Sequence, residues 1–275
     1  MDFFNALLQP DNLFLRLALG VGLAASLAFG VIGTFVVTRR ISYLAGAVSH
    51  CVLGGIGAAL YLETVWQIKW LDPLSGALIT ALLAAFIIGR WGRNGNEREE
   101  TLIGATWAIG MALGIIFIDL TPGYFNLTSY LFGDILLVSR ADLIRILLLD
   151  LVVVLFTLTF YHQLLALSFD EEFARLRGVR VELLYQLLLA LTAITVVLMI
   201  RVVGIIMVIA LLTLPAAAAA RIARRLWQMM LLAVLFSLLS IVAGLSLSYQ
   251  ADLAAGPTII LAAGAIYLAT RCLAR

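Results

Sequence analysis

Ionisable side chains are rare inside the apolar stretches of this sequence, and two candidates for chemistry stand next to each other. His50 and Cys51 lie in an apolar stretch at about residues 43–62. A neutral imidazole is a common ligand of transition metals, and a thiolate is a soft one. Neighbouring helical residues point about 100° apart, so the two do not easily chelate one ion together. His50 has an alternative role as a hydrogen-bonding residue between helices. For Cys51 we favour the alternative of a small packing residue.

A single carboxylate, Asp150, lies in the middle of a second apolar stretch, residues 141–167. Charge in a lipid core is costly, so Asp150 must face the interior of a helix bundle, a subunit interface or water. An ion-path carboxylate and a structural hydrogen-bonding group fit this position equally well. The other histidine, His162, lies near the end of the same stretch, where we expect it at the membrane interface. The candidate metal ligands are therefore His50, Cys51 and Asp150.

Apolar helices that can cross a bilayer must position these residues. The 275-residue chain is 64% hydrophobic and 12% charged, whereas soluble domains are nearer a quarter charged. A spanning helix needs roughly 20 mostly apolar residues. We predict an all-α polytopic bundle of about nine (eight to nine) transmembrane helices, forming a single transmembrane domain over residues 1–275. The predicted spans are residues 12–37, 43–62, 72–90, 101–119, 141–167, 181–199, 203–220, 226–248 and 256–273.

The basic residues predict how these helices are oriented. If the loop with Arg39 and Arg40 is cytoplasmic and the spans alternate, most of the 18 Lys and Arg residues fall in cytoplasmic segments. This asymmetry is the positive-inside pattern of membrane proteins. The N-terminus is then external and the C-terminus cytoplasmic.

The sequence lacks the signatures of an ATP site and of the main hydrolase classes. A P-loop needs a Lys after its glycines, and the only Lys, Lys69, follows no glycine loop. Neither His-Glu-x-x-His nor Gly-x-Ser-x-Gly occurs. Nothing in the sequence indicates a nucleic-acid partner. We predict no enzymatic activity and no permanently bound cofactor.

One cytoplasmic segment, at about residues 168–180, differs in character from the loops around it. Acidic residues open it, arginines close it and a glycine stops it, which predicts a short helix matched to its own dipole. Its phenylalanines could dock into a groove of a partner; a solvated turn between spans is the alternative. The residues concerned are Phe169, Asp170, Glu171, Glu172, Phe173, Ala174 and Gly178.

Five segments of the chain carry a resemblance to a known family. They are Arg39–His50, Leu131–Ser139 followed by Asp142 and Leu143, Phe169–Gly178, Val203–Ala217 and Ser248–Thr258. Together they resemble the permease (membrane-spanning) subunit of zinc/manganese-type metal-ion ABC importers, and they occur in the family's order over nearly the whole chain. The resemblance implies a type II importer permease in the bacterial inner (cell) membrane.

The resemblance also implies partners. The permease would form a homodimer with a second copy of itself, with the ion path between or within the two. A cytoplasmic ATP-binding subunit would bind the segment at 168–180 as a coupling helix, and an external metal-binding protein would deliver the ion. The transported divalent ion would be zinc or manganese, with iron(II) as a further candidate.

The chain departs from the family at one position of the first segment. The family typically has an Asp four residues before the histidine, and residues four apart share a helix face. Here that position is Gly46, whereas His50 is retained. Asp150 substitutes for the missing carboxylate, Cys51 shifts the preference toward softer ions, or the site is weaker.

We therefore predict the membrane-spanning subunit of an ABC importer of a divalent transition metal. One alternative is the permease of a related importer for a metal chelate or a vitamin. Another is a secondary transporter that couples protons through Asp150 and His50 and needs no ATPase. An intramembrane enzyme is the least favoured.

Overall fold

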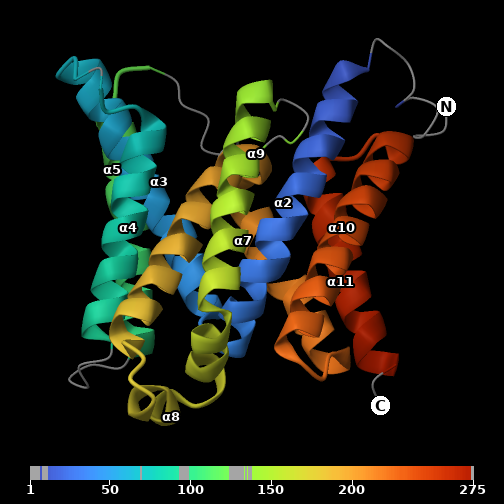
Figure 1. Cartoon of the computed structure of the whole chain (residues 1–275). Coiled ribbons are helices and arrows are strands. Elements are labelled where there is room, and N and C mark those ends of the chain that lie inside the picture. The colour runs from blue at the N-terminus through green and yellow to red at the C-terminus, as the bar shows by residue number, and fades with distance from the viewer. Residues whose placement is uncertain are drawn as a thin grey trace. The chain divides into compact units, whose positions relative to one another are not determined.

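Helices make up all the regular secondary structure in the part of the chain that the computed structural model describes, namely residue 7 and residues 12–68, 70–92, 99–123, 133, 135 and 138–273. Eight of these helices are long and apolar enough to cross a membrane, and a short ninth helix is not (Figure 1). The helices are α2 (Leu13–Thr38), α3 (Ser42–Val65), α4 (Pro73–Trp91), α5 (Glu99–Leu120), α7 (Arg140–Phe169), α8 (Glu171–Leu176), α9 (Val181–Ile222), α10 (Leu226–Ala251) and α11 (Ala255–Leu273).

The difference between eight and nine spans lies in α9. This helix has 42 residues, and its backbone leaves the helical region at Gly204, with φ 78° and ψ 164°. That region is accessible essentially only to glycine. At 1.5 Å per residue, the parts before and after Gly204 are about 34 Å and about 27 Å long. Each can therefore cross a lipid core of about 30 Å. The two spans predicted at 181–199 and 203–220 are the two parts of this one broken helix.

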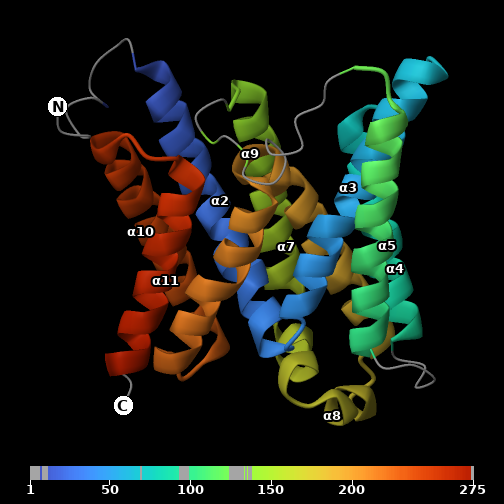
Figure 2. The ribbon, with the colours of Figure 1, turned by 180° about the vertical axis from the view of Figure 1, so that it is seen from behind.

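The helices fall into two compact units, each made of segments that are distant in sequence. One unit contains Ile41–Leu127 and Phe169–Val197, and so α3, α4, α5, α8 and the first part of α9. Within it α3 packs against both α4 and α5, and the three lie side by side in both views (Figures 1 and 2). The N-terminus of α4 is specified locally. The Asp72 carboxylate accepts a hydrogen bond from the Ser75 N–H, at 3.2 Å, and Pro73 occupies the first turn.

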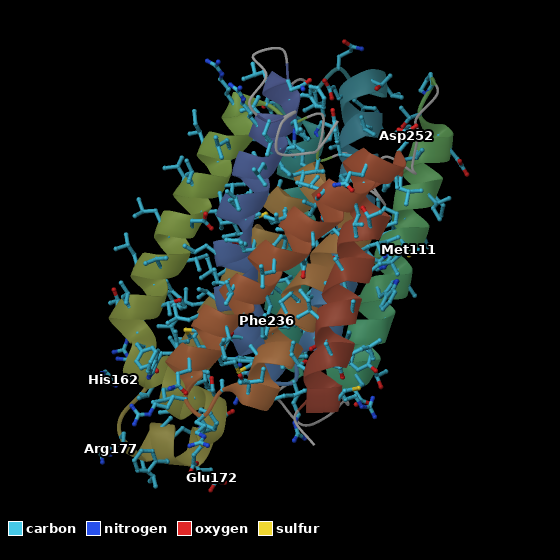
Figure 3. All side chains as sticks on the ribbon, turned by 90° about the vertical axis from the view of Figure 1, so that its right-hand side faces the viewer. Met111, His162, Glu172, Arg177, Phe236 and Asp252 are labelled. Atoms are coloured by element: carbon cyan, nitrogen blue, oxygen red, sulfur yellow. The ribbon has the colours of Figure 1, made fainter. Side chains whose placement is uncertain are left out.

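The other unit contains Met1–Arg40, Thr128–Ser168 and Leu198–Arg275. Here α10 packs against both α2 and α11. Small residues allow close approach in this unit as well, since Gly30 meets the backbone of Val234 and Gly33 that of Leu212. The α10 helix ends at Asp252, which adopts a left-handed conformation with φ 52°. Asp252, which precedes α11, is labelled in Figure 3.

Candidate functional site

His50 lies on α3 with its imidazole against α5. The ring stacks on the indole of Trp107, with centroids 4.5 Å apart and planes 10° from parallel. The side chain is half-buried, and its Nδ1 is buried without a hydrogen-bond partner among the described residues. An unpaired buried polar atom costs about 1–3 kcal/mol. Among the described residues, the Nδ1 of His50 therefore makes no hydrogen bond to a neighbouring helix.

Glycines bring α3 and α5 close enough for this stack. A Cβ on Gly54 would lie 2.7 Å from the Gly110 carbonyl oxygen, and one on Gly57 would lie 2.6 Å from that of Gly114. The backbones are thus in direct contact, as the small residues of these segments allow. The contacts advance along both helices in the same sense, from His50 and Trp107 to Gly57 and Gly114. The two helices are therefore parallel, as expected for spans separated by one other span.

Cys51 packs against the same helix, at Gly110. A Cβ on Gly110 would lie 2.6 Å from the Cys51 Cα and 2.9 Å from its Sγ. The thiol is free and half-buried. This close contact with α5 favours the packing role of Cys51 over a role as a metal ligand.

Asp150 is buried on α7, with 7% of its surface exposed. Its Oδ1 has no hydrogen-bond partner among the described residues, and its carboxyl lies beside the backbone of Ala28 in α2. Asp150 and His50 belong to different units. Among the described residues, no three His, Cys, Asp or Glu side chains form a group that could hold a metal ion.

Sequence reasoning missed the role of Asp142, which organises the start of α7. Its Oδ2 accepts hydrogen bonds from the Ser139 backbone N–H at 3.1 Å and from the Ser139 hydroxyl at 2.6 Å. Its Oδ1 lies 2.8 Å from Arg145 Nη1 and 3.6 Å from Arg201 Nε. The spacing Ser-x-x-Asp before an apolar run is a capping-box pattern, and this signal predicts the local part of the cluster. The pairing with Arg201 on α9 is a tertiary contact that no local pattern contains.

The break in α9 lies against Gly133, from the segment that precedes α7. Gly133 has φ 64°, and a Cβ on it would collide with the backbone of Val203 and Gly204. Segments two and four of the family resemblance thus meet where Gly133 contacts Val203 and Gly204. Asp142 of segment two also pairs with Arg201, two residues before segment four begins. Leu131, Phe132, Asp134, Leu136 and Leu137 of segment two lie outside the described residues.

The predicted short cytoplasmic helix is present as α8. The Asp170 carboxylate caps it by accepting a hydrogen bond from the Phe173 N–H at 2.9 Å. Arg175 in its last turn pairs with Glu171 at 3.3 Å. The helix ends just before Gly178, which has φ 77°. Ala174 is the buried residue of this helix. Capping acid, closing arginine and terminal glycine are each where the sequence predicts them.

The end of α7 and the outer side of α8 are partly apolar. Phe169 is 71% exposed, Phe173 is 46% exposed, and the Arg177 guanidinium lies over the Phe173 ring at 5.1 Å. Figure 3 shows Glu172 and Arg177 on the outer side of this segment. Large apolar side chains among charges are typical of a surface that binds another protein. The exposed His162 lies near the end of α7, its ring edge-on to Tyr161.

Comparison with known proteins places these features in a family. Residues 11–274 match the ABC-3 family, described as the ABC 3 transport family. The chain belongs to this family. A membrane protein of Synechocystis sp. described as uncharacterized is 41% identical over 93% of this chain and 89% of its own length. The manganese transport system membrane protein MntC of Halalkalibacterium halodurans is 34% identical over 96% and 88%.

A solved structure has the same fold. PsaBC from Streptococcus pneumoniae, in complex with Fab, superposes with a TM-score of 0.84 at 33% identity and covers 98% of this chain and 94% of its own. The all-α bundle predicted from composition is thereby confirmed. As a family member the chain is a membrane transport protein. The resemblance leads one to expect Asp at position 46, and the Gly46 found there lies buried in α3.

Proposed function

We propose that this chain is the membrane-spanning subunit of an ABC importer that moves a divalent transition metal ion, with manganese as its first candidate. The observation that carries the proposal is the likeness to PsaBC over 98% of the chain, in fold and in sequence together. Relatives named as manganese transport system proteins, such as MntC, support manganese over zinc or iron(II).

The side chain proposed to meet the ion is His50. Imidazole nitrogen binds divalent first-row metal ions, manganese more weakly than zinc, whereas a thiolate selects softer ions. The packing of Cys51 against Gly110 supports a harder ion such as manganese over a softer one. A transport site must also release its ion, so it is expected to bind weakly and to have few protein ligands. Asp150 is the carboxylate that we propose as a further ion-path residue.

The proposal includes three partners. A cytoplasmic ATP-binding subunit would hold α8 as the coupling helix, a second copy would complete the permease, and an external metal-binding protein would deliver the ion. In this arrangement the N-terminus is external, the C-terminus is cytoplasmic, and the membrane is the bacterial inner membrane. ATP would shift the permease between outward- and inward-open states by favouring the state that it binds better.

One other function has an observation in its favour. Both His50 Nδ1 and Asp150 Oδ1 are buried and unpaired among the described residues, as groups that exchange protons with a path would be. A proton-coupled transporter would work through these groups without an ATPase. It ranks second because it gives no role to the exposed apolar side of α8.

The test is to express the chain with its candidate ATPase and external protein, and to measure uptake into vesicles of manganese, zinc and iron(II). We expect ATP-dependent uptake of manganese. His50→Ala should reduce uptake while leaving assembly intact, with His162→Ala as the matched control, because His162 is the only other histidine. Phe173→Asp should abolish binding of the ATPase. Uptake driven by a pH gradient in the chain alone would replace the importer with the proton-coupled transporter.

A further inference from the structure

The stack between His50 and Trp107 gives the candidate path side chain a contact of defined geometry. An aromatic pair with centroids 4.5 Å apart and planes 10° from parallel restricts how the imidazole can rotate. One face of the ring is covered by the indole. An approaching ion therefore meets His50 at its edge, where the two nitrogens lie.

The position of Trp107 depends on the glycine contact between α5 and α3. Trp107 and Gly110 are three residues apart and so share a face of α5. Because Gly110 has no side chain, this face reaches the backbone of Cys51. The indole one turn earlier is then level with His50. A side chain at position 110 would lift the whole face away from α3, and Trp107 with it.

The stack acquires a role because of what is missing on α3. Gly46, one turn before His50, offers no carboxylate that could hold the imidazole by a hydrogen bond. Nδ1 also has no hydrogen-bond partner among the described residues. Among the described residues, stacking on Trp107 is a contact that can orient the imidazole.

We propose that Trp107 is a positioning residue of the ion path, whose indole ring holds the His50 imidazole in the orientation from which a nitrogen meets the passing divalent cation. This inference rests on the proposed function. Trp107 itself does not bind the ion. It acts through His50. Because the stack already restricts the rotation of the imidazole, less conformational freedom is lost when the ion binds.

The expected size of the effect follows from the energy of aromatic pairs, which corresponds to a factor of about 2 to about 12 in an equilibrium. Trp107→Leu should raise the KM for Mn²⁺ by this factor in the assembled importer. The maximal rate should change by less than about twofold, because ATP-driven steps do not involve the indole. Trp107→Phe keeps an aromatic ring and should recover most of the loss.

Two controls separate positioning from a general structural effect. Trp227→Leu removes a half-exposed indole from α10, in the other unit, and should leave KM unchanged. In a His50→Ala background, Trp107→Leu should have no further effect on KM, because the residue through which it acts is gone. Equal effects of Trp107→Leu with and without His50 would overturn the proposal.

A spectroscopic measurement tests the stack without transport. The chain has two histidines, so a histidine-labelled permease gives two sets of ring signals, assigned by His162→Ala. The His50 ring protons should be shifted upfield by the indole ring current, and Trp107→Leu should remove the shift. Paramagnetic Mn²⁺ should broaden the His50 signals and leave those of His162 sharp.

The outcomes distinguish this inference from the function on which it rests. A wild-type complex that moves no metal ion would overturn the proposed function, and this inference with it. Normal manganese uptake with an unchanged KM in Trp107→Leu would overturn this inference alone. An unshifted His50 signal in the wild type would do the same.

Discussion

Gly110→Ala tests whether direct backbone contact between α3 and α5 holds their unit together. The new Cβ would lie 2.6 Å from the Cys51 Cα, whereas ordinary contacts of a Cβ begin at 3.4 Å. The atom that it meets is backbone and cannot rotate away. The helices must therefore separate locally by roughly 0.8 Å, a gap that forfeits a quarter to a half of the dispersion energy across it.

The magnitude follows from a comparison on the same helix. Gly104 also lies in α5, and a Cβ on it would meet nothing within 4 Å. Gly104→Ala should stabilise the protein by up to about 1 kcal/mol through helix propensity alone. Gly110→Ala has the same gain but adds overpacking, which costs about 1–3 kcal/mol. The difference between the two variants isolates the steric effect.

The assay is SDS-induced unfolding in mixed micelles, followed by circular dichroism, with both variants compared with the wild type. We expect Gly110→Ala to be less stable than Gly104→Ala by about 1–3 kcal/mol. The histidine ring signal should also change in Gly110→Ala, because the indole moves with α5. Equal stability of the two variants would refute the argument that backbone contact at Gly110 determines how α3 and α5 pack.

Three further changes test the other clusters. Asp142→Ala should destabilise the protein by about 2–3 kcal/mol in the same assay, because it removes a helix cap and two arginine contacts. The arginine contacts are partly screened by solvent and contribute the smaller share. Asp142→Asn keeps the cap and should therefore lose less stability. Gly204→Ala forces a side chain into a glycine-only backbone region and should cost about 1–3 kcal/mol, whereas Gly20→Ala, where a Cβ has open space, should not be destabilising. Asp170→Ala should weaken α8 by about 1 kcal/mol and lower ATPase binding, and Asp170→Asn should preserve both; unchanged binding in the Ala variant would mean that capping of α8 is irrelevant to docking.

Local features of the sequence predicted local structure well. The predicted spans agree with the observed helices to within a few residues, because a run of about 20 apolar residues in lipid has no alternative to a helix. The α8 helix was predicted from Asp170, Arg175 and Gly178, since capping and dipole effects act within one or two turns. One boundary was less well defined. The sequence predicts that one span ends at residue 199 and the next begins at residue 203, whereas the helix continues to Gly204 and breaks there.

The candidate site was only partly predictable. His50 was found because an ionisable group in an apolar span is rare and therefore conspicuous. Trp107 was not found, since an aromatic residue in a membrane helix is ordinary and its partner is 57 positions away. The same holds for Arg201 beside Asp142.

The amino-acid sequence by itself determined that the chain spans a membrane, where its helices lie, and which side chains are expensive enough to need a function. These properties depend on composition and on spacing within a helix. The tertiary structure alone decided that His50 is stacked on Trp107, that Cys51 packs on Gly110, and that Asp142 reaches α9. Such contacts depend on which faces of separate helices meet, and that is set by small residues and shape along the whole interface, not by any short pattern.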